Sequence, residues 1–295
     1  MSKIAIAVLT RDNQPNLMVN LSHHAKLLAG TDIPFYIFDN SVNTDNSAII
    51  SQFPQFKYHK HDKDLSFDES VRYALTNMEG EYVWVLGDKI RICAGALPCI
   101  EDYMKHMEFS ACLINHMHRL TLLVQPYVDT DRNNFMLQAG WHSTLLGSTI
   151  YHRDTINAVD FDRYMGSEFI HCAALFDGIV KNDKPLLVMT HSLTTSQLPE
   201  MGGQTPAWIP RCVEVWTEKL YEMVMKLPHL YTQDVKIAFC NHNGFNGGLL
   251  SDNQFQYLAN HGYFNEEILD KYLPYLKQVC TIPEGRLREI AKTSR

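Results

Sequence analysis

Three apolar runs in the first third of the chain each lead directly into a polar cluster. They span residues 4–9, 33–38 and 82–86, and the clusters that follow are Thr10-Arg-Asp-Asn13, Asp39-Asn-Ser41 and Gly87-Asp88. Short runs rich in β-branched and aromatic residues predict buried strands. Ligands of open α/β sheets bind outside the carboxyl ends of the strands, so these clusters predict a ligand site along one sheet edge.

Helical patterns separate these predicted strands. Asn13-Gln-Pro15 is typical of a helix start, and an apolar stripe follows it until Gly30. Ser66-Phe-Asp-Glu69 has the spacing of a capping box and predicts a second helix, whereas residues 56–61 alternate like a short strand. Because the crossovers have helical length, we predict an α/β fold with a mostly parallel, doubly wound, Rossmann-like sheet through residue 92.

Later segments predict more strands and then a helical region. Helices are predicted at 97–107 and from Ser167 to Phe176, and strands at 110–114, 122–127 and 185–189. From residue 205 the pattern is helical at 211–226 and 265–279, with an interruption at Pro274 and one strand-like segment at 235–239. The predicted organisation is therefore an α/β domain, 1–204, and a helical C-terminal region, 205–295.

The composition is that of an ordinary soluble globular protein, with 295 residues, 45% hydrophobic and 20% charged. A formal charge of -7 argues against a nucleic-acid partner, which would require clustered Lys and Arg. No apolar run approaches the ~18–20 residues that span a bilayer, and no signal-peptide layout opens the chain, so a cytoplasmic location is expected. The seven cysteines lack C-x-x-C spacing, which favours reduced thiols.

Four motifs follow one another in a recognisable order: Asp39-Asn-Ser41, a capped helix with Asp68, residues 80–88 ending in Asp88, and Tyr164-Met-Gly-Ser-Glu168. This order resembles glycosyltransferase family 2, nearest to its abequosyltransferase-like bacterial polysaccharide enzymes, over residues 3–195. The resemblance implies a GT-A fold and an inverting enzyme. Such an enzyme moves a hexosyl or deoxyhexosyl group from a nucleotide diphosphate to a hydroxyl of a glycan or lipid-linked glycan. It also implies a role in surface polysaccharide biosynthesis, of capsule or O-antigen type.

The resemblance also implies roles for individual residues. The end of the first strand, at Thr10, and Asp39 would hold the nucleotide, and Asp88 would grip the diphosphate through Mg²⁺ or Mn²⁺. Where the family continues with further acids, this chain has Lys89 and Ile90. One carboxylate beside an ammonium is a poor site for a hard cation, so metal use is left open.

Lys89 has two interpretations of equal weight. It neutralises the leaving diphosphate in place of a metal, or it points to solvent in a degenerate enzyme. Asp39 also suits an Asx-turn. Asp68 is a further candidate for donor binding, although it also suits the first turn of a helix. Arg11 and Arg72 are candidate phosphate or base contacts, although each taken singly is more typical of an exposed salt bridge.

Glu168 is the predicted general base, because it stands where the family keeps its catalytic acid, at the start of a helix. The alternative is His171, one turn further, which is otherwise a buried, hydrogen-bonded histidine. A helix N-terminus stabilises a carboxylate and disfavours an imidazolium, which favours Glu168 as the group that accepts the proton.

The C-terminal segment 271–295 carries six Lys or Arg against two Glu, a balance of +4 in an acidic protein. This balance suggests peripheral contact with the inner face of a membrane, although an ordinary solvated tail explains it equally well. Five aromatic residues between positions 257 and 275 could equally form an apolar homo-oligomer face: Tyr257, Tyr263, Phe264, Tyr272 and Tyr275.

Two other functions compete with glycosyl transfer. One is a non-catalytic nucleotide-sugar binding protein that has lost its metal motif. The other is a Rossmann-type oxidoreductase, against which stands the absence of G-x-G-x-x-G after the first strand.

Overall fold

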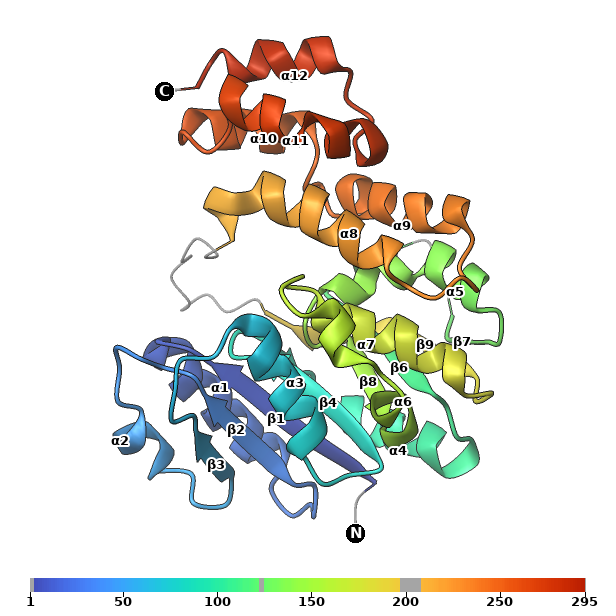
Figure 1. Cartoon of the computed structure of the whole chain (residues 1–295). Coiled ribbons are helices and arrows are strands. Elements are labelled where there is room, and N and C mark those ends of the chain that lie inside the picture. Colours follow the sequence, from blue (N-terminus) through green and yellow to red (C-terminus); the bar gives the residue numbers. More distant parts are fainter. Residues whose placement is uncertain (1–2, 122–124, 197–207, 295) are drawn as a thin grey trace.

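The computed structural model describes residues 3–121, 125–196 and 208–294, apart from the side chain of Phe245. These residues form an α/β layer that carries a stack of helices at one end (Figure 1). The strands are β1 (Ile4–Thr10), β2 (Phe35–Asp39), β3 (Lys57–Lys60), β4 (Tyr82–Gly87), β5 (Arg91–Ile92), β6 (Ala111–His116), β7 (Tyr127–Asp129), β8 (Thr149–His152) and β9 (Leu186–Thr195).

The helices alternate with the strands up to β9 and then continue alone. They are α1 (Gln14–Leu27), α2 (Ser47–Ile50), α3 (Phe67–Asn77), α4 (Ala96–His106), α5 (Arg132–Gln138), α6 (Arg153–Asn157), α7 (Ile170–Gly178), α8 (Leu220–Met225), α9 (Gln233–Asn246), α10 (Asp252–Asn260), α11 (Glu266–Val279) and α12 (Glu284–Ala291). A π-helical segment, η5 (Glu214–Lys219), leads directly into α8.

The first half of the sheet is parallel, in the order β3-β2-β1-β4, as predicted. Thr10 pairs with Asp39 and Leu9 with Gly87, so the carboxyl ends of β1, β2 and β4 meet at one edge. The α3 crossover begins at the predicted capping box, in which Ser66 and Glu69 bond each other's backbone N–H groups. The sheet edge expected from the sequence is therefore present.

The second half of the sheet is mixed. It continues β8-β6-β9-β5, with β7 beside β9; β8 runs antiparallel to β4 and β6, whereas β6 and β9 are parallel. The strands predicted at 110–114 and 185–189 correspond to β6 and to the first part of a longer β9. Of the strand predicted at 122–127, residues 122–124 lie outside the described part of the chain, and β7 begins at Tyr127.

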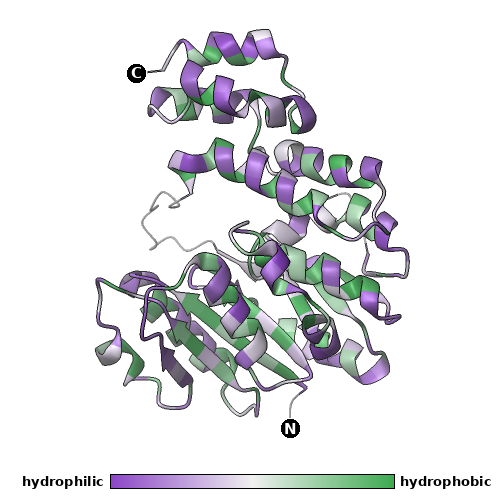
Figure 2. Cartoon of the chain, in the orientation of Figure 1, coloured by the Kyte–Doolittle hydropathy of each residue, from purple (hydrophilic) through white to green (hydrophobic). Residues whose placement is uncertain are grey.

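Alternate residues along the strands enter two different cores. Ile6 and Trp84 belong to the cluster beneath α1 and α4, whereas Ala7 and Val85 belong to the cluster beneath α3 and α7. The strands are accordingly hydrophobic on both faces, and the outer helices carry alternating hydrophobic and hydrophilic stripes (Figure 2). The α3 side of the sheet shares its cluster with Phe255 and Leu287 of the C-terminal helices.

The C-terminal helices differ from the sequence prediction at two places. The strand-like segment 235–239 lies inside α9, where Phe239 is fully buried against Phe176 of α7. Helix α11 also continues through Pro274, because its buried face, which includes Leu269 and Leu276, holds the helix together around the missing N–H. Tertiary packing therefore overrides local preference in both segments.

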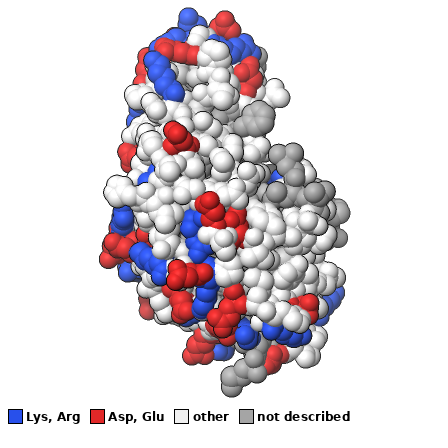
Figure 3. Space-filling model, turned by 90° about the vertical axis from the view of Figure 1, so that its right-hand side faces the viewer, with Lys and Arg blue, Asp and Glu red and all other residues white. Residues whose placement is uncertain are grey.

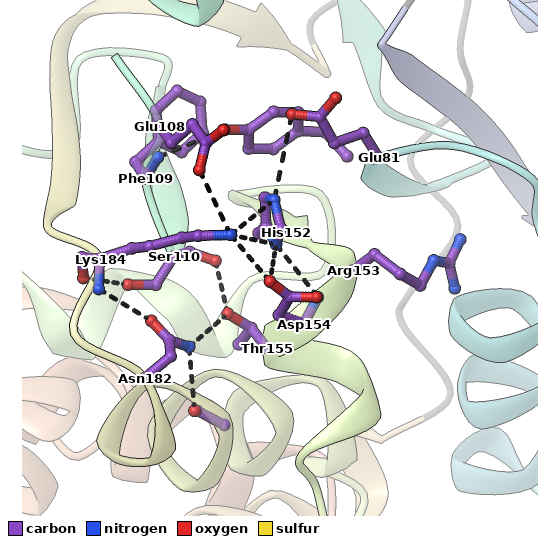
Figure 4. A network of polar contacts seen from close by, with 12 residues as sticks. Glu81, Glu108, Phe109, Ser110, His152, Arg153, Asp154, Thr155, Asn182 and Lys184 are labelled. Carbon is purple, nitrogen blue, oxygen red and sulfur yellow. Dashed lines mark hydrogen bonds and ion pairs between the residues drawn. The ribbon is translucent and has the colours of Figure 1, made fainter.

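A polar network closes the sheet at the end opposite to Asp88 (Figure 4). Lys184 Nζ lies 2.8 Å from Asp154 Oδ2, 3.1 Å from the ring of His152 and 3.5 Å from Glu108. These contacts join the start of β9 to the end of β8 and to the loop before β6. They stabilise the scaffold at a place remote from the strand-end cluster.

Candidate functional site

A cavity of about 300 Å³ lies at the carboxyl ends of β1 and β4, and we call it the strand-end cavity. It is lined by Leu9, Thr10, Arg11, Asn13, Asn40, Phe67, Ser70, Gly87, Asp88 and Leu146. Six of these side chains are polar, and they come from three strand ends and from α3. Three of the predicted contact residues, Thr10, Arg11 and Asp88, are thereby brought together.

Asp88 is the carboxylate of this cavity. Burial raises its pKa to about 6, against hydrogen bonds from Asn13 and Thr10 and the charge of Lys89, which lower it. The Thr10 hydroxyl donates to Asp88 Oδ2 at 3.1 Å, and Asn20 of α1 donates to the backbone oxygen of Asp88 at 3.0 Å. The side chain is therefore fixed in place and ready to accept hydrogen bonds from a ligand when ionised.

The carboxylate of Asp39 does not reach the cavity. It is fully buried, and it accepts hydrogen bonds from the backbone N–H of Ser41 at 2.8 Å, the Tyr58 hydroxyl at 2.9 Å and the Asn46 amide at 3.0 Å. The Asx-turn considered for this position is what the structure contains. Asn40, the next residue, lines the cavity instead.

The predicted cations differ in their positions. Arg11 lines the cavity and pairs with exposed Asp64 at 3.0 Å, an ion pair too exposed to hold it strongly. Lys89 is half-buried beside Asp88 but is not part of the cavity wall. Arg72 pairs with Asp162 at 2.6 Å on the outer side of α3, so the structure does not bring it to this site.

A second cavity, of about 360 Å³, adjoins the first, and we call it the aromatic cavity. It is lined by Phe67, Arg119, Thr144, Leu145, Leu146, Glu168, Phe169, His171, Trp208, Val215, Trp216, Gly247 and Leu249. Phe67 and Leu146 also line the strand-end cavity, so the two hollows share a wall. Phe67, on this shared wall, is 41% exposed.

Glu168 lies on the wall of the aromatic cavity, but not inside a helix as predicted. Helix α7 begins only at Ile170, and Glu168 has a left-handed backbone with φ 63°. The buried carboxylate of Asp68 holds this turn by accepting the backbone N–H of Glu168 at 3.0 Å and that of Ile170 at 3.4 Å. Asp68 therefore caps α7 from α3, a role that neither sequence interpretation anticipated.

Two cations hold the Glu168 side chain. Its Oε1 accepts a hydrogen bond from Arg211 at 2.6 Å and another from Lys219. Burial alone would raise the pKa of Glu168, but the bonds to Lys219 and Arg211 lower it below the ordinary value. Both cations contact the same oxygen, so Oε2 is the atom that can face a ligand.

His171 is buried in the second position of α7. Its Nε2 lies 3.0 Å from the carbonyl oxygen of Thr144, so Nε2 carries the proton and Nδ1 is an acceptor. Burial lowers the pKa of His171 to about 4. The neutral ring stacks edge-on against Phe67 at 5.8 Å and lines the aromatic cavity.

The donor set at Asp88 does not fit a resident divalent metal. Among the described residues, no three His, Cys, Asp or Glu side chains gather as a metal site would require. Asp88 is the single carboxylate among the described residues that line the cavity, and the neighbouring side chain is the ammonium of Lys89. We therefore derive no step through a metal.

Some residues of the site gave no signal in the sequence. Arg211 and Lys219 lie 43 and 51 positions beyond Glu168, and only the packing of η5 against the α7 turn brings them together. Arg119, Trp208 and Trp216 likewise reach the aromatic cavity from separate loops and helices. Asn40 could have been found, since it belongs to the same strand-end turn as Asp39.

Two of the C-terminal arginines are paired with acids. Arg286 contacts Asp252 and Glu289, Arg288 contacts Asp270 and Glu284, and charges of both signs are interspersed at this end of the molecule (Figure 3). Of the five aromatic residues considered for an oligomer face, Phe264 and Tyr272 are buried within the chain. In the described ranges no helix is both long and apolar enough to cross a membrane.

Comparisons with known proteins give the fold. No protein-family model and no curated protein sequence matches the chain. S. aureus TarS 1-349 in complex with UDP-GlcNAc is similar in structure, with a TM-score of 0.60 and 14% identity over 97% of this chain and 83% of that one. The mannosyltransferase PcManGT from Pyrobaculum calidifontis, in complex with GDP-Man and Mn²⁺, has a TM-score of 0.57 and 13% identity over 98% and 86%. The chain therefore has the GT-A fold with a helical C-terminal region, as predicted.

Proposed function

We propose that this protein is a glycosyltransferase that moves a sugar from a nucleotide diphosphate to a hydroxyl group of a glycan or lipid-linked glycan. One observation carries the proposal: a polar cavity at the strand ends shares a wall with an aromatic cavity that contains a carboxylate. A donor in the first and an acceptor in the second would meet at Phe67 and Leu146.

The strand-end cavity suits the nucleotide part of the donor. Asp88, when ionised, accepts hydrogen bonds from ribose hydroxyls, while Asn13 and Asn40 offer both donors and acceptors. Arg11 lies on the wall and Lys89 beside it, and both are available to neutralise the diphosphate as it leaves. Nucleotide sugars bound to TarS and to PcManGT, two proteins with this fold, support this use of the cavity.

Glu168 is the proposed general base for the acceptor hydroxyl. In a single displacement, the acceptor oxygen bonds to the anomeric carbon while the bond from that carbon to the diphosphate breaks. Glu168 Oε2 takes the hydroxyl proton, and the diphosphate leaves with the electron pair. One displacement inverts the anomeric configuration, and the positive charge that develops on the sugar is like that in glycoside hydrolysis.

The finer assignments of the proposal come from the sequence. The family resemblance implies bacterial surface polysaccharide biosynthesis and a hexosyl or deoxyhexosyl donor, whereas the apolar pattern and the basic C-terminal tail motivate a cytoplasmic location with peripheral membrane contact. Asp252 and Asp270, which pair with Arg286 and Arg288, reduce the excess positive charge around the tail, which weakens the case for membrane contact. Homo-oligomer formation stays a prediction.

A thermal-shift panel of UDP, GDP, CDP, dTDP and NAD tests the proposal. We expect one nucleoside diphosphate to raise the melting temperature by a few degrees, because a ligand at ~100 times its dissociation constant adds roughly 2.7 kcal/mol. Because the donor set at Asp88 does not suit a metal, the shift should persist in EDTA.

The other outcomes separate the competing functions. Stabilisation by NAD alone would point to an oxidoreductase, and no shift with any of the five compounds would refute nucleotide binding at this site. Nucleotide binding without hydrolysis or transfer of the corresponding nucleotide sugar would indicate a non-catalytic binding protein. Loss of the shift in EDTA, with recovery in Mn²⁺, would show that Asp88 does recruit a metal.

A further inference from the structure

Arg119 stands out among the residues that line the aromatic cavity. Its guanidinium stacks on the ring of Trp141 at 5.0 Å, which fixes the plane of the group without using any of its N–H donors. No carboxylate of the described residues lies within 4.0 Å of it, and none of their oxygens accepts a hydrogen bond from its side chain. Burial lowers the pKa of Arg119, with no acid nearby to oppose the effect.

The described part of the chain offers Arg119 no counter-ion in this cavity. Glu168 is the single carboxylate among the described lining residues, and its Oε1 is already bonded to Arg211 and Lys219. A partly buried cation without a counter-ion costs free energy, because it loses hydration and gains no charge partner. Such a group is retained where a ligand supplies the missing charge.

Two further polar atoms on the same wall lack partners. Nε1 of Trp216 is a buried donor and Nδ1 of His171 a buried acceptor, and neither is hydrogen-bonded by any described residue. Around them the wall is aromatic: Trp216 packs edge-on against Phe169 at 5.1 Å and against Trp208 at 5.7 Å. Both unpaired atoms have almost no accessible surface, so a ligand in the cavity would meet the flat aromatic faces, which are typical of a site that binds a ring-shaped molecule.

We propose that the aromatic cavity binds an acceptor sugar or polyol that carries an anionic group, a phosphate or a carboxylate, and that Arg119 recognises this group. This inference rests on the proposed transferase function, because the bound molecule is an acceptor only if the protein transfers a sugar. In this arrangement the anion pairs with Arg119 and the reacting hydroxyl lies toward Glu168. Arg119 is then a residue that determines specificity, and it takes no part in proton transfer.

Three probes that differ at a single carbon test the proposal: glucose, glucose 6-phosphate and glucuronate. Their binding is measured through tryptophan fluorescence, since Trp208 and Trp216 line the cavity and Trp141 lies under Arg119. The strand-end cavity is kept saturated with whichever nucleoside diphosphate stabilises the protein, so that the probes do not bind there. We expect at least one anionic probe to bind tenfold or more tightly than glucose, as expected for a charge-assisted bond.

Variants assign the preference to Arg119. Arg119→Gln should reduce the ratio between anionic and neutral probes to near one, and Arg119→Lys should retain part of it. Arg163→Gln is the matched control, because Arg163 also stacks on an aromatic ring, Tyr164 at 5.6 Å, but is exposed outside the cavity. This control should behave as the wild-type protein, and an unchanged melting temperature would show that the variants fold.

The arms separate the possible outcomes. Binding of glucose 6-phosphate alone would identify a phosphate acceptor, binding of glucuronate alone a carboxylate acceptor, and both would support the proposal. Equal affinity for all three probes, no binding up to about 10 mM, or a preference that survives Arg119→Gln would overturn it. If the preference appears but no nucleotide binds, the anion site stands and the transferase function fails; nucleotide binding without the preference gives the reverse result.

Discussion

At the scale of single residues, Glu168, the proposed general base, combines two properties that such a base must balance. Its pairs with Arg211 and Lys219 keep it ionised at neutral pH, so it is always available to accept a proton. The same cations make it a weaker base, because they stabilise the form that must be neutralised. Such a base suits a reaction in which the proton moves late, when the acceptor oxygen has already begun to bond to the sugar.

Substitution of Glu168 distinguishes it from its alternative. Glu168→Gln should lower turnover by ~10²–10⁴ while leaving nucleotide affinity unchanged, because it removes the proton acceptor and preserves the shape. His171→Asn should cost much less, since the buried ring donates to Thr144 and serves the wall of the cavity. Steady-state rates with a competent donor and acceptor, beside nucleotide titrations, check both variants. A nearly normal rate for Glu168→Gln would move the role to His171 or to another acid.

The acidity of Glu168 can be altered without touching it. Lys219→Met removes one of the two hydrogen bonds that lower the pKa of Glu168. Burial raises this pKa, so the pKa of Glu168 should be higher in the variant. Since protonated Glu168 cannot accept a proton, the acid side of the pH–rate profile should move to higher pH in this variant. An identical profile for Lys219→Met and wild type would show that the titration of Glu168 does not limit the rate.

At the scale of elements, the bond from α3 to the start of α7 controls how Glu168 is presented. Asp68→Ala should lower the free energy of unfolding by ~1–3 kcal/mol, because two backbone N–H groups at the α7 start lose their acceptor. Turnover should fall more than nucleotide affinity, since the turn with positive φ at Glu168 would relax.

Ser66→Ala is the control for that experiment. Ser66 caps the same helix α3 but makes no contact with the Glu168 turn, so its loss should cost ~1 kcal/mol of stability and little turnover. Chemical denaturation and rate measurements on both variants separate a general loss of stability from a local one. Equal losses of turnover in the two variants would contradict a specific role for Asp68.

Elements fixed by neighbours along the chain are the ones that the sequence could predict. The capping box at Ser66 and the strands leading to Thr10 and Asp88 depend on residues within a few positions, and they are found where expected. The strand-like segment 235–239 lies in a helix because α7 supplies its apolar contacts, and no local pattern reveals that. For the same reason, the two cations that bind Glu168 could not be predicted. The sequence pattern also predicts a ligand contact for Asp39, whereas in the structure its hydrogen-bond partners include Asn46 and Tyr58 of the same chain.

At the scale of the whole molecule, buried histidines should make the fold sensitive to acid. Burial lowers the pKa of His24 and His142 to about 3 and that of His116 and His171 to about 4. In the unfolded chain each would titrate near its ordinary value of about 6.5, so the unfolded state binds protons first as the pH falls. Stability is therefore full above pH ~6.5 and is lost as the pH drops through that value, until the folded-state pKa is reached.

The expected loss is large enough to measure. Each of these histidines can contribute up to about 1.4 kcal/mol per pH unit below its unfolded pKa. The melting temperature should therefore fall clearly between pH 7 and pH 5, and His24→Asn should make the decrease less steep. A melting temperature that stays constant over this range would contradict the prediction that these buried histidines stay neutral in the folded protein and so lower its stability in acid.

The position of Glu168 between two parts of the chain limits how such a protein can diverge. Its backbone is held by Asp68 of the α/β layer, whereas its side chain is held by Arg211 and Lys219 of the helical region. A chimaera that kept residues 3–196 and took its last helices from another protein of this fold would inherit the strand-end cavity intact. It would not inherit the pair of cations, so its base would titrate differently from that of either parent. The two parts of this chain must therefore evolve together, even though the sequence suggests that they are separable modules.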